Sequence, residues 1–243
     1  MGISPYIIKN DPETFGTPYR LIRLEGGGIR VVLFPQTPAP HKISETNIPG
    51  TFPPLAHPED HCWVGNNYKV NARKLLILSE SFYDRNKDRT NDPNPSKKLV
   101  EWCAISHLNR FSYYSKLVRL CSGSFGQADT PSFWHEVSLL HFVRQGLDRP
   151  RATPSQDQLR ASILRCVRLV EALTPSVILV PSKRLWRFLL AEGLVTETDG
   201  YRGHFHAFIG PVHAAAIGHP ASATKFADSK AQIVRLLRSE SAR

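Results

Sequence analysis

Two short polar segments carry the side chains best suited to chemistry. Residues 79–84 read Ser-Glu-Ser-Phe-Tyr-Asp, so that two carboxyl groups, two hydroxyls and two aromatic rings lie close together. Residues 217–222 read Ile-Gly-His-Pro-Ala-Ser, in which a histidine precedes a proline turn. Carboxylates can orient water, an imidazole can donate or accept a proton, and aromatic rings can wall a pocket for a planar ligand. Each segment alone is also typical of an ordinary polar turn. The two can form a functional site only if the fold places them next to each other.

Each segment follows a short apolar run that is typical of a buried strand. The sequence has four such runs, at 74–79, 137–143, 177–180 and 214–218. Helical patterns accompany them at 99–120 with Ser96 as a cap, at 155–173 between the capping box of Ser155 and the stop at Pro175, at 182–190 and at 228–238. Strands that alternate with helices predict an α/β fold with a parallel sheet. Because ligands bind at the carboxyl ends of such strands, the two polar segments and His141 are expected at one pocket.

The first seventy residues differ from the rest in composition. They hold ten of the 19 prolines, which recur too often between Pro35 and Pro58 for a helix. Residues 19–24 and 29–34 flank Glu25-Gly26-Gly27-Gly28 and predict a hairpin. We therefore expect residues 1–70 to form an extension or cap and residues 71–243 to form the α/β domain.

In order and placement, these segments resemble the uracil-DNA glycosylase superfamily. That family has a motif of the type Gly-Gln-Asp-Pro-Tyr or Gly-Glu-Ala-Pro-Gly after its first strand and His-Pro-Ser after its fourth. Residues 78–84 look like the first motif and 218–222 like the last, while 133–143 and 173–186 resemble the middle of bacterial members. The resemblance spans roughly residues 72–226. It implies a three-layer α/β sandwich with a central, mainly parallel four-stranded sheet.

The chain departs from the family at positions that set base specificity. Ser79 replaces the first glycine of the motif, Phe82 replaces its proline, and Ser81 stands where uracil-specific members have a water-activating aspartate. His141 falls where an asparagine reads the uracil edge, and Ala223 where a bulky wedge follows the His-Pro segment. A histidine offers a base different hydrogen bonds from an asparagine. We therefore expect a modified pyrimidine as the target before uracil.

The resemblance also implies roles for individual residues. His219 would donate a hydrogen bond to the departing base, and Glu80 or Asp84 would orient the attacking water. The target nucleotide must first be flipped out of the duplex into a pocket. The residues expected to line that pocket are Ser79, Ser81, Phe82, Tyr83, His141 and Ser222.

The chain is basic, which indicates a polyanionic partner. Lys and Arg number 31 against 21 Asp and Glu, a net charge of +10. Several basic residues follow the expected strands, where DNA phosphates would lie, although solvated helix faces also carry such charge. The residues expected to bind DNA are Arg144, Arg149, Arg151, Lys183, Arg184 and Lys225, with Arg187 on the same helix as Arg184 and Phe226 as a wedge or a core residue.

The sequence therefore predicts a DNA glycosylase that hydrolytically excises uracil or a modified pyrimidine and leaves an abasic site. Hydroxymethylated or glucosylated bases of phage DNA are candidate targets, in base excision or antiviral defence. Two alternatives stay open. A non-catalytic nucleic-acid-binding module on the same fold would bind DNA without cleaving it. A hydrolase of small nucleosides would not need the basic residues that are expected to bind DNA.

Cofactors, metals and membranes are not expected. His57, His61 and Cys62 have metal-like spacing but no second pair of ligands nearby in the sequence. The four cysteines are too few and too scattered for a disulfide framework. No apolar stretch approaches the roughly 20 residues that span a bilayer, and the N-terminus lacks a secretory pattern. We expect a cytoplasmic monomer.

Overall fold

The four apolar runs form the centre of the sheet in a computed structural model of the chain, which describes residues 19–23, 29–33, 57–83, 94–106, 111–121, 130–149, 152–207, 210–221 and 226–240. The runs correspond to β4 (Leu75–Ser79), β5 (Ser138–His141), β6 (Val177–Val180) and β9 (Gly210–Ala216). These strands are parallel and lie in the order β5-β4-β6-β9. Every residue of β4, β5 and β6 is buried, as continuous apolar runs predict. The α/β fold class is confirmed.

The expected sheet had four strands, mainly parallel. Among the described residues the sheet has seven strands, and it is mixed, with parallel strands at its centre and antiparallel strands at both edges. At one edge β3 (Trp63–Val64) pairs antiparallel with β5. At the other edge β8 (Arg202–Ala207) pairs antiparallel with β9, and β7 (Val195–Asp199) with β8. Sequence reasoning missed both β7 and β8. Most of β7 is exposed, and in β8 two buried residues alternate with half-buried ones. Such strands have no continuous apolar run to reveal them.

The N-terminal part contains the predicted hairpin. β1 (Tyr19–Arg23) and β2 (Ile29–Leu33) pair antiparallel, with Tyr19 opposite Leu33, as a separate two-stranded sheet. Residues 57–70, which composition grouped with the extension, pack into the α/β body. There a 3₁₀ turn, η1 (Pro58–Asp60), precedes β3, and the Trp63 indole Nε1 donates to the Trp134 carbonyl over 2.7 Å.

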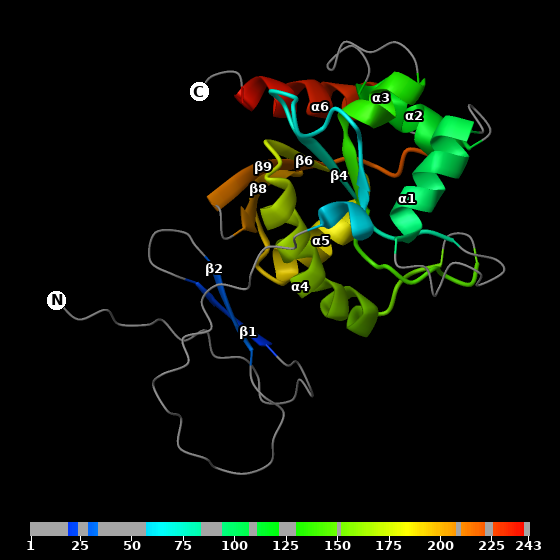
Figure 1. Cartoon of the computed structure of the whole chain (residues 1–243). Coiled ribbons are helices and arrows are strands. Elements are labelled where there is room, and N and C mark those ends of the chain that lie inside the picture. The colour runs from blue at the N-terminus through cyan, green and yellow to red at the C-terminus, as the bar shows by residue number, and fades with distance from the viewer. Residues whose placement is uncertain are drawn as a thin grey trace, which may run out of the picture.

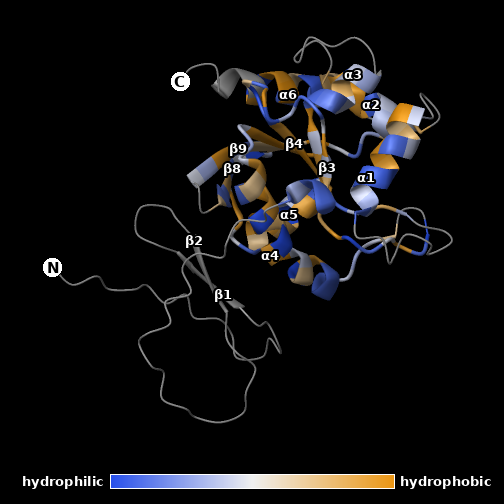
Figure 2. Cartoon of the chain, viewed as in Figure 1, coloured by the Kyte–Doolittle hydropathy of each residue, from blue (hydrophilic) through white to orange (hydrophobic). Residues whose placement is uncertain are grey.

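Helices cover both faces of the sheet (Figure 1). Leu76 and Leu78 of β4 pack into a core with α4 (Gln156–Leu173) and α5 (Lys183–Ala191). Leu75 and Ile77 face the opposite core. The helices of that second core are α1 (Pro95–Val100), the π-helix η2 (Glu101–Ser106), α2 (Ser112–Cys121), α3 (Thr130–Glu136) and α6 (Phe226–Glu240). Figure 2 shows mainly hydrophobic colour on the central strands and a mixture of hydrophilic and hydrophobic colour on the helices around them.

Local signals place several helix ends. The capping box of Ser155 and Gln158 opens α4, and Ser182 caps α5 through the Leu185 amide. The expected cap Ser96 is wrong, because Asn94 is the N-cap of α1 and its side chain accepts from the Lys97 amide over 3.0 Å. Ser96 lies inside the helix and is buried. In the ranges that the structure describes, no helix is long and apolar enough to cross a membrane.

Candidate functional site

The segments after β4 and β5 run side by side at the carboxyl edge of the sheet. Ser79 and His141 are register partners at the ends of these strands. The Leu147 amide donates to the Phe82 carbonyl over 2.9 Å, and Tyr83 forms a parallel bridge with Leu147. The edge therefore brings together the first polar segment and His141, as the strand rule predicts.

A tyrosine links the first polar segment to the His-Pro segment. The hydroxyls of Ser79 and Tyr113 lie 2.7 Å apart, and the Tyr113 ring packs against the His219 ring with centroids 5.2 Å apart. Burial raises the pKa of Tyr113, so its hydroxyl stays protonated. Ser79 and His219 thus contact the same tyrosine, one at its hydroxyl and the other at its ring, although sequence reasoning did not single out Tyr113.

The hydrogen bond at His219 defines which ring nitrogen carries the proton. The Ala221 amide donates to His219 Nδ1 over 3.2 Å, so Nδ1 is an acceptor. A neutral imidazole with an accepting Nδ1 has its proton on Nε2. The side chain is exposed. It can therefore offer an Nε2–H donor to a ligand at this edge of the sheet.

His141 is buried and neutral. Burial, aided by the nearby Arg165 charge, lowers its pKa to about 3. Its Nδ1 lies 2.9 Å from the Ser96 hydroxyl, whose oxygen also accepts from the His141 amide. Its ring meets the edge of the Phe82 ring at a centroid distance of 5.2 Å. The His141 ring is therefore held between the Ser96 hydroxyl and the Phe82 ring.

Arg165 of α4 fixes the strand end that carries His141. Its Nη2 donates to the carbonyls of His141 and Phe142, each over 2.6 Å. Burial lowers the pKa of this guanidinium. These bonds hold the backbone where β5 ends, and with it the position of the His141 ring.

Glu80 points to the other side of the sheet and pairs with Arg184. Arg184 Nε donates to Oε1 over 2.7 Å and Nη2 donates to Oε2 over 2.6 Å, so the pair is bidentate. The Ser182 hydroxyl also donates to Oε2 over 3.3 Å, and Arg184 Nη1 donates to the Thr153 hydroxyl over 2.5 Å. The Glu80 carboxylate raises the pKa of Arg184. Two residues expected to meet water and DNA separately are thus partners of each other.

The other predicted DNA-binding residues differ in their surroundings. Lys183 Nζ lies 3.9 Å from the centroid of the Tyr201 ring, and Arg187 donates to the Tyr201 hydroxyl over 3.3 Å. Arg149 is exposed and lines an open hollow of about 650 Å³ that Thr153 also borders, while Arg144 is half-buried. The basic residues expected to bind DNA therefore include an exposed one, Arg149, and two that contact the Tyr201 side chain, Lys183 and Arg187.

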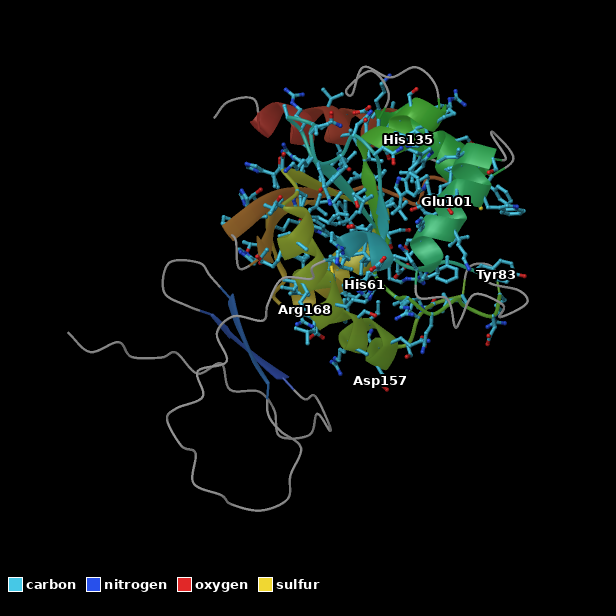
Figure 3. All side chains as sticks on the ribbon, in the orientation of Figure 1. His61, Tyr83, Glu101, His135, Asp157 and Arg168 are labelled. Atoms are coloured by element: carbon cyan, nitrogen blue, oxygen red, sulfur yellow. The ribbon has the colours of Figure 1, made fainter. Side chains whose placement is uncertain are left out.

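Of the remaining predicted site residues, two have side chains that the structure describes and the others do not. Ser81 is half-buried, and Tyr83, which Figure 3 labels, is 38% exposed. Four predicted residues and one side chain lie outside the described residues, namely Asp84, Arg151, Ser222, Lys225 and the side chain of Phe226, the first residue of α6.

Within the described ranges, no group of three or more His, Cys, Asp or Glu residues could hold a metal ion. His57 instead contacts the Glu59 carboxylate at 3.7 Å. The Cys62 thiol donates to the Pro58 carbonyl over 3.2 Å, and burial raises its pKa to about 12. The four cysteines, all among the described residues, are buried and form no disulfide.

The chain was compared with known protein families and with curated proteins. Neither the known protein-family models nor the curated proteins include a match to this chain.

Proposed function

We propose that the chain is a DNA glycosylase of the uracil-DNA glycosylase-like fold. The observation that carries the proposal is the group of Ser79, Tyr113 and His219, in which an exposed imidazole whose Nδ1 accepts from the Ala221 amide stands beside the first polar segment. The central strands β5-β4-β6-β9 and the helices on both faces support the three-layer sandwich that this fold implies.

His219 supplies the electrostatic part of the reaction. Cleavage of the N-glycosidic bond leaves negative charge on the departing base and positive charge on the sugar. The Nε2–H of His219 donates to a carbonyl oxygen of the base, where that negative charge develops. The base enters after its nucleotide has been flipped out of the helix. Phe82 and Tyr83 form the pocket walls, and Nε2 of His141 meets the polar edge of the base.

A carboxylate orients the water that attacks the sugar. Glu80 can do so only from within its ion pair, because Oε2 accepts from Arg184 and Ser182 while Oε1 accepts one bond from Arg184. A carboxylate oxygen accepts two hydrogen bonds, so Oε1 retains one position for water. Asp84 is the second candidate for this role.

The target base is uracil or, preferentially, a modified pyrimidine such as a hydroxymethylated or glucosylated base of phage DNA. A neutral histidine stands where the resemblance places the asparagine that reads uracil. The histidine offers one ring nitrogen in place of a carboxamide, so its hydrogen-bond pattern differs. The protein acts as a cytoplasmic monomer in base excision or antiviral defence.

The test is a cleavage assay on end-labelled oligonucleotides. Separate strands carry uracil, 5-hydroxymethyluracil, 5-hydroxymethylcytosine or glucosylated 5-hydroxymethylcytosine. Each is incubated with wild type and with His219→Ala in EDTA and then treated with hot alkali, which breaks abasic sites. A break at one modified position that disappears in the variant supports the proposal and identifies the base. Undiminished cleavage by the variant refutes the role of His219.

A non-catalytic nucleic-acid-binding module is the second candidate. The observation that favours it is the bidentate ion pair of Arg184 with Glu80. This pair engages the carboxylate that the first polar segment places at the edge of the sheet. This candidate predicts salt-sensitive DNA binding without any alkali-labile product. DNA binding with no break on any strand, single or double, selects it over the glycosylase.

A further inference from the structure

Trp102 is the exposed tryptophan of this protein. Its side chain is 40% exposed, whereas Trp63 is 6% exposed and Trp134 and Trp186 are fully buried, and the sequence has four tryptophans in all. It lies in η2, and π-helices are rare and often occur at functional sites. The Phe111 ring packs beside it with centroids 5.0 Å apart and planes tilted by 49°. These two rings form an accessible aromatic surface, called here the Trp102–Phe111 pair.

The pair lies close along the chain to residues of the candidate site. Ser96, which bonds His141, precedes Trp102 by six residues on continuous helix, a rise of roughly 9 Å. Phe111 precedes Tyr113, which contacts Ser79 and His219, by two residues. About three stacked nucleotides cover a rise of that size. A strand whose target base lies in the pocket can therefore reach the pair with its neighbouring bases.

The charges around the pair suit a nucleic-acid strand. Among the described residues of α1, η2 and α2, the charged side chains are four cations and one anion, namely Lys97, Lys98, Lys116, Arg119 and Glu101. Lys98 precedes Trp102 by four residues, a spacing that places both on one helix face. Lys116 Nζ donates to the Ala221 carbonyl of the His-Pro segment over 3.4 Å. Figure 3 shows Glu101, the neighbour of Trp102, and Tyr83 toward the same side of the view.

We infer that the Trp102–Phe111 pair stacks with unpaired bases that flank the target nucleotide, so that the substrate is single-stranded or locally opened DNA. Every base has an aromatic face, so stacking on Trp and Phe does not depend on sequence. The surrounding cations neutralise the phosphates of the same strand. The inference rests on the proposed function in taking the neighbouring site as a base pocket.

Tryptophan fluorescence tests the inference directly, because Trp102 is the accessible tryptophan. The probe is unmodified oligothymidylate, which lacks a target base, compared at one salt concentration with its duplex with oligoadenylate. We expect the single strand to quench the emission of the wild type. Trp102→Phe should bind within a few-fold of wild type with the quenching lost, and Trp102→Ala should bind roughly 5- to 150-fold more weakly, the range that one stacked base supplies.

Val70→Ala is the matched control, because Val70 is 83% exposed and lies before β4, at the opposite end of that strand from the site. It should bind oligothymidylate like the wild type. Wild-type affinity in Trp102→Ala would overturn the inference, as would an equal loss of duplex and single-strand binding. Persistent quenching in Trp102→Phe would also overturn it. Thermal unfolding of each variant shows whether it is folded.

The inference and the proposed function fail in different ways. If Trp102→Ala loses single-strand binding but no oligonucleotide is cleaved by the wild type, the stacking surface stands and the enzyme does not. If a modified base is excised and Trp102→Ala excises it from single strands and binds them as the wild type does, the enzyme stands and the stacking surface does not.

Discussion

The residues at the end of β4 divide between two sides of the sheet that differ in charge. On the α2 side, Ser79 lies with Phe82, Tyr113, His141 and His219, and their contacts join hydroxyls, aromatic rings and imidazoles. On the α5 side, Glu80 lies with Thr153, Ser182 and Arg184 in a network built on an ion pair. Consecutive residues of a strand point to opposite faces, so this short polar segment supplies both sides.

The comparison suggests a division of labour. On the α5 side the charged groups pair with each other, which holds α5 and Thr153 against the strand end and leaves Glu80 a single acceptor position, on Oε1, for water. The α2 side presents the exposed imidazole of His219 and the buried imidazole of His141, and the Nδ1 atoms of both are engaged in hydrogen bonds. Substitutions on the α2 side should therefore change activity more than stability, and those on the α5 side the reverse.

The largest expected effect is on the α2 side. His219→Ala should slow single-turnover excision roughly 100- to 1000-fold, the usual loss when one donor to a developing anion is removed. The urea midpoint should change little because the side chain is exposed. A loss of stability that accounts for the loss of activity would contradict the assignment of His219 to the reaction.

The second effect is a pH dependence that His141 imposes on stability. Its folded pKa of about 3 lies below the ordinary value of 6.5, so the unfolded chain binds the proton more tightly. The stabilisation is present above pH 6.5 and is lost as the pH falls toward 3. Between pH 6.5 and 4, the free energy of unfolding should fall by about 3 kcal/mol more in wild type than in His141→Gln.

Urea unfolding of both proteins across this pH range measures the difference. The carboxylates of the protein titrate in the same range, but they are common to both proteins, so their effect cancels when the two are compared. Parallel curves for the two proteins would show that His141 charges freely in the folded state. That result would contradict its burial as a neutral group.

The third effect is on the α5 side. Arg184→Ala leaves the buried Glu80 carboxylate without its bidentate partner and should lower the free energy of unfolding by about 2 kcal/mol. The loss stays below the roughly 3–5 kcal/mol of a fully buried pair, since 46% of the Arg184 side chain is exposed to water. Arg187→Ala is the control on the same helix and should change stability by less than about 0.5 kcal/mol. Equal effects of the two substitutions would remove the distinction between the sides.

Sequence reasoning located the centre of the sheet and part of the site for physical reasons that differ. Buried parallel strands need continuous apolar runs, so β4 and β6 were visible within a residue of their ends. Because ligand sites lie at the carboxyl ends of parallel strands, Ser79 and His141 were expected together, and they are register partners. β7 and β8 were not visible, because β7 is an edge strand, β8 lies next to it, and neither has a continuous apolar run.

The missed site residues depend on contacts between distant segments. Tyr113 lies on a helix whose apolar spacing explains its presence, since it precedes the buried Leu117 by four residues, and nothing local shows that it bonds Ser79. The pairing of Glu80 with Arg184 joins residues 104 positions apart. A sequence alone shows that both are charged, but only the fold shows that they neutralise each other.

The smallest expected effect tests the link within the α2 side. Tyr113→Phe keeps the ring against His219 but removes the bond to Ser79, and should lower the free energy of unfolding by about 1 kcal/mol. Ser79→Ala removes the same bond from the other end. If the two hydroxyls act on each other, the double variant should be about 1 kcal/mol more stable than the sum of the single losses predicts. Additive losses in urea unfolding would mean that each hydroxyl acts through other partners, and the α2 side would then be two separate contacts rather than one connected site.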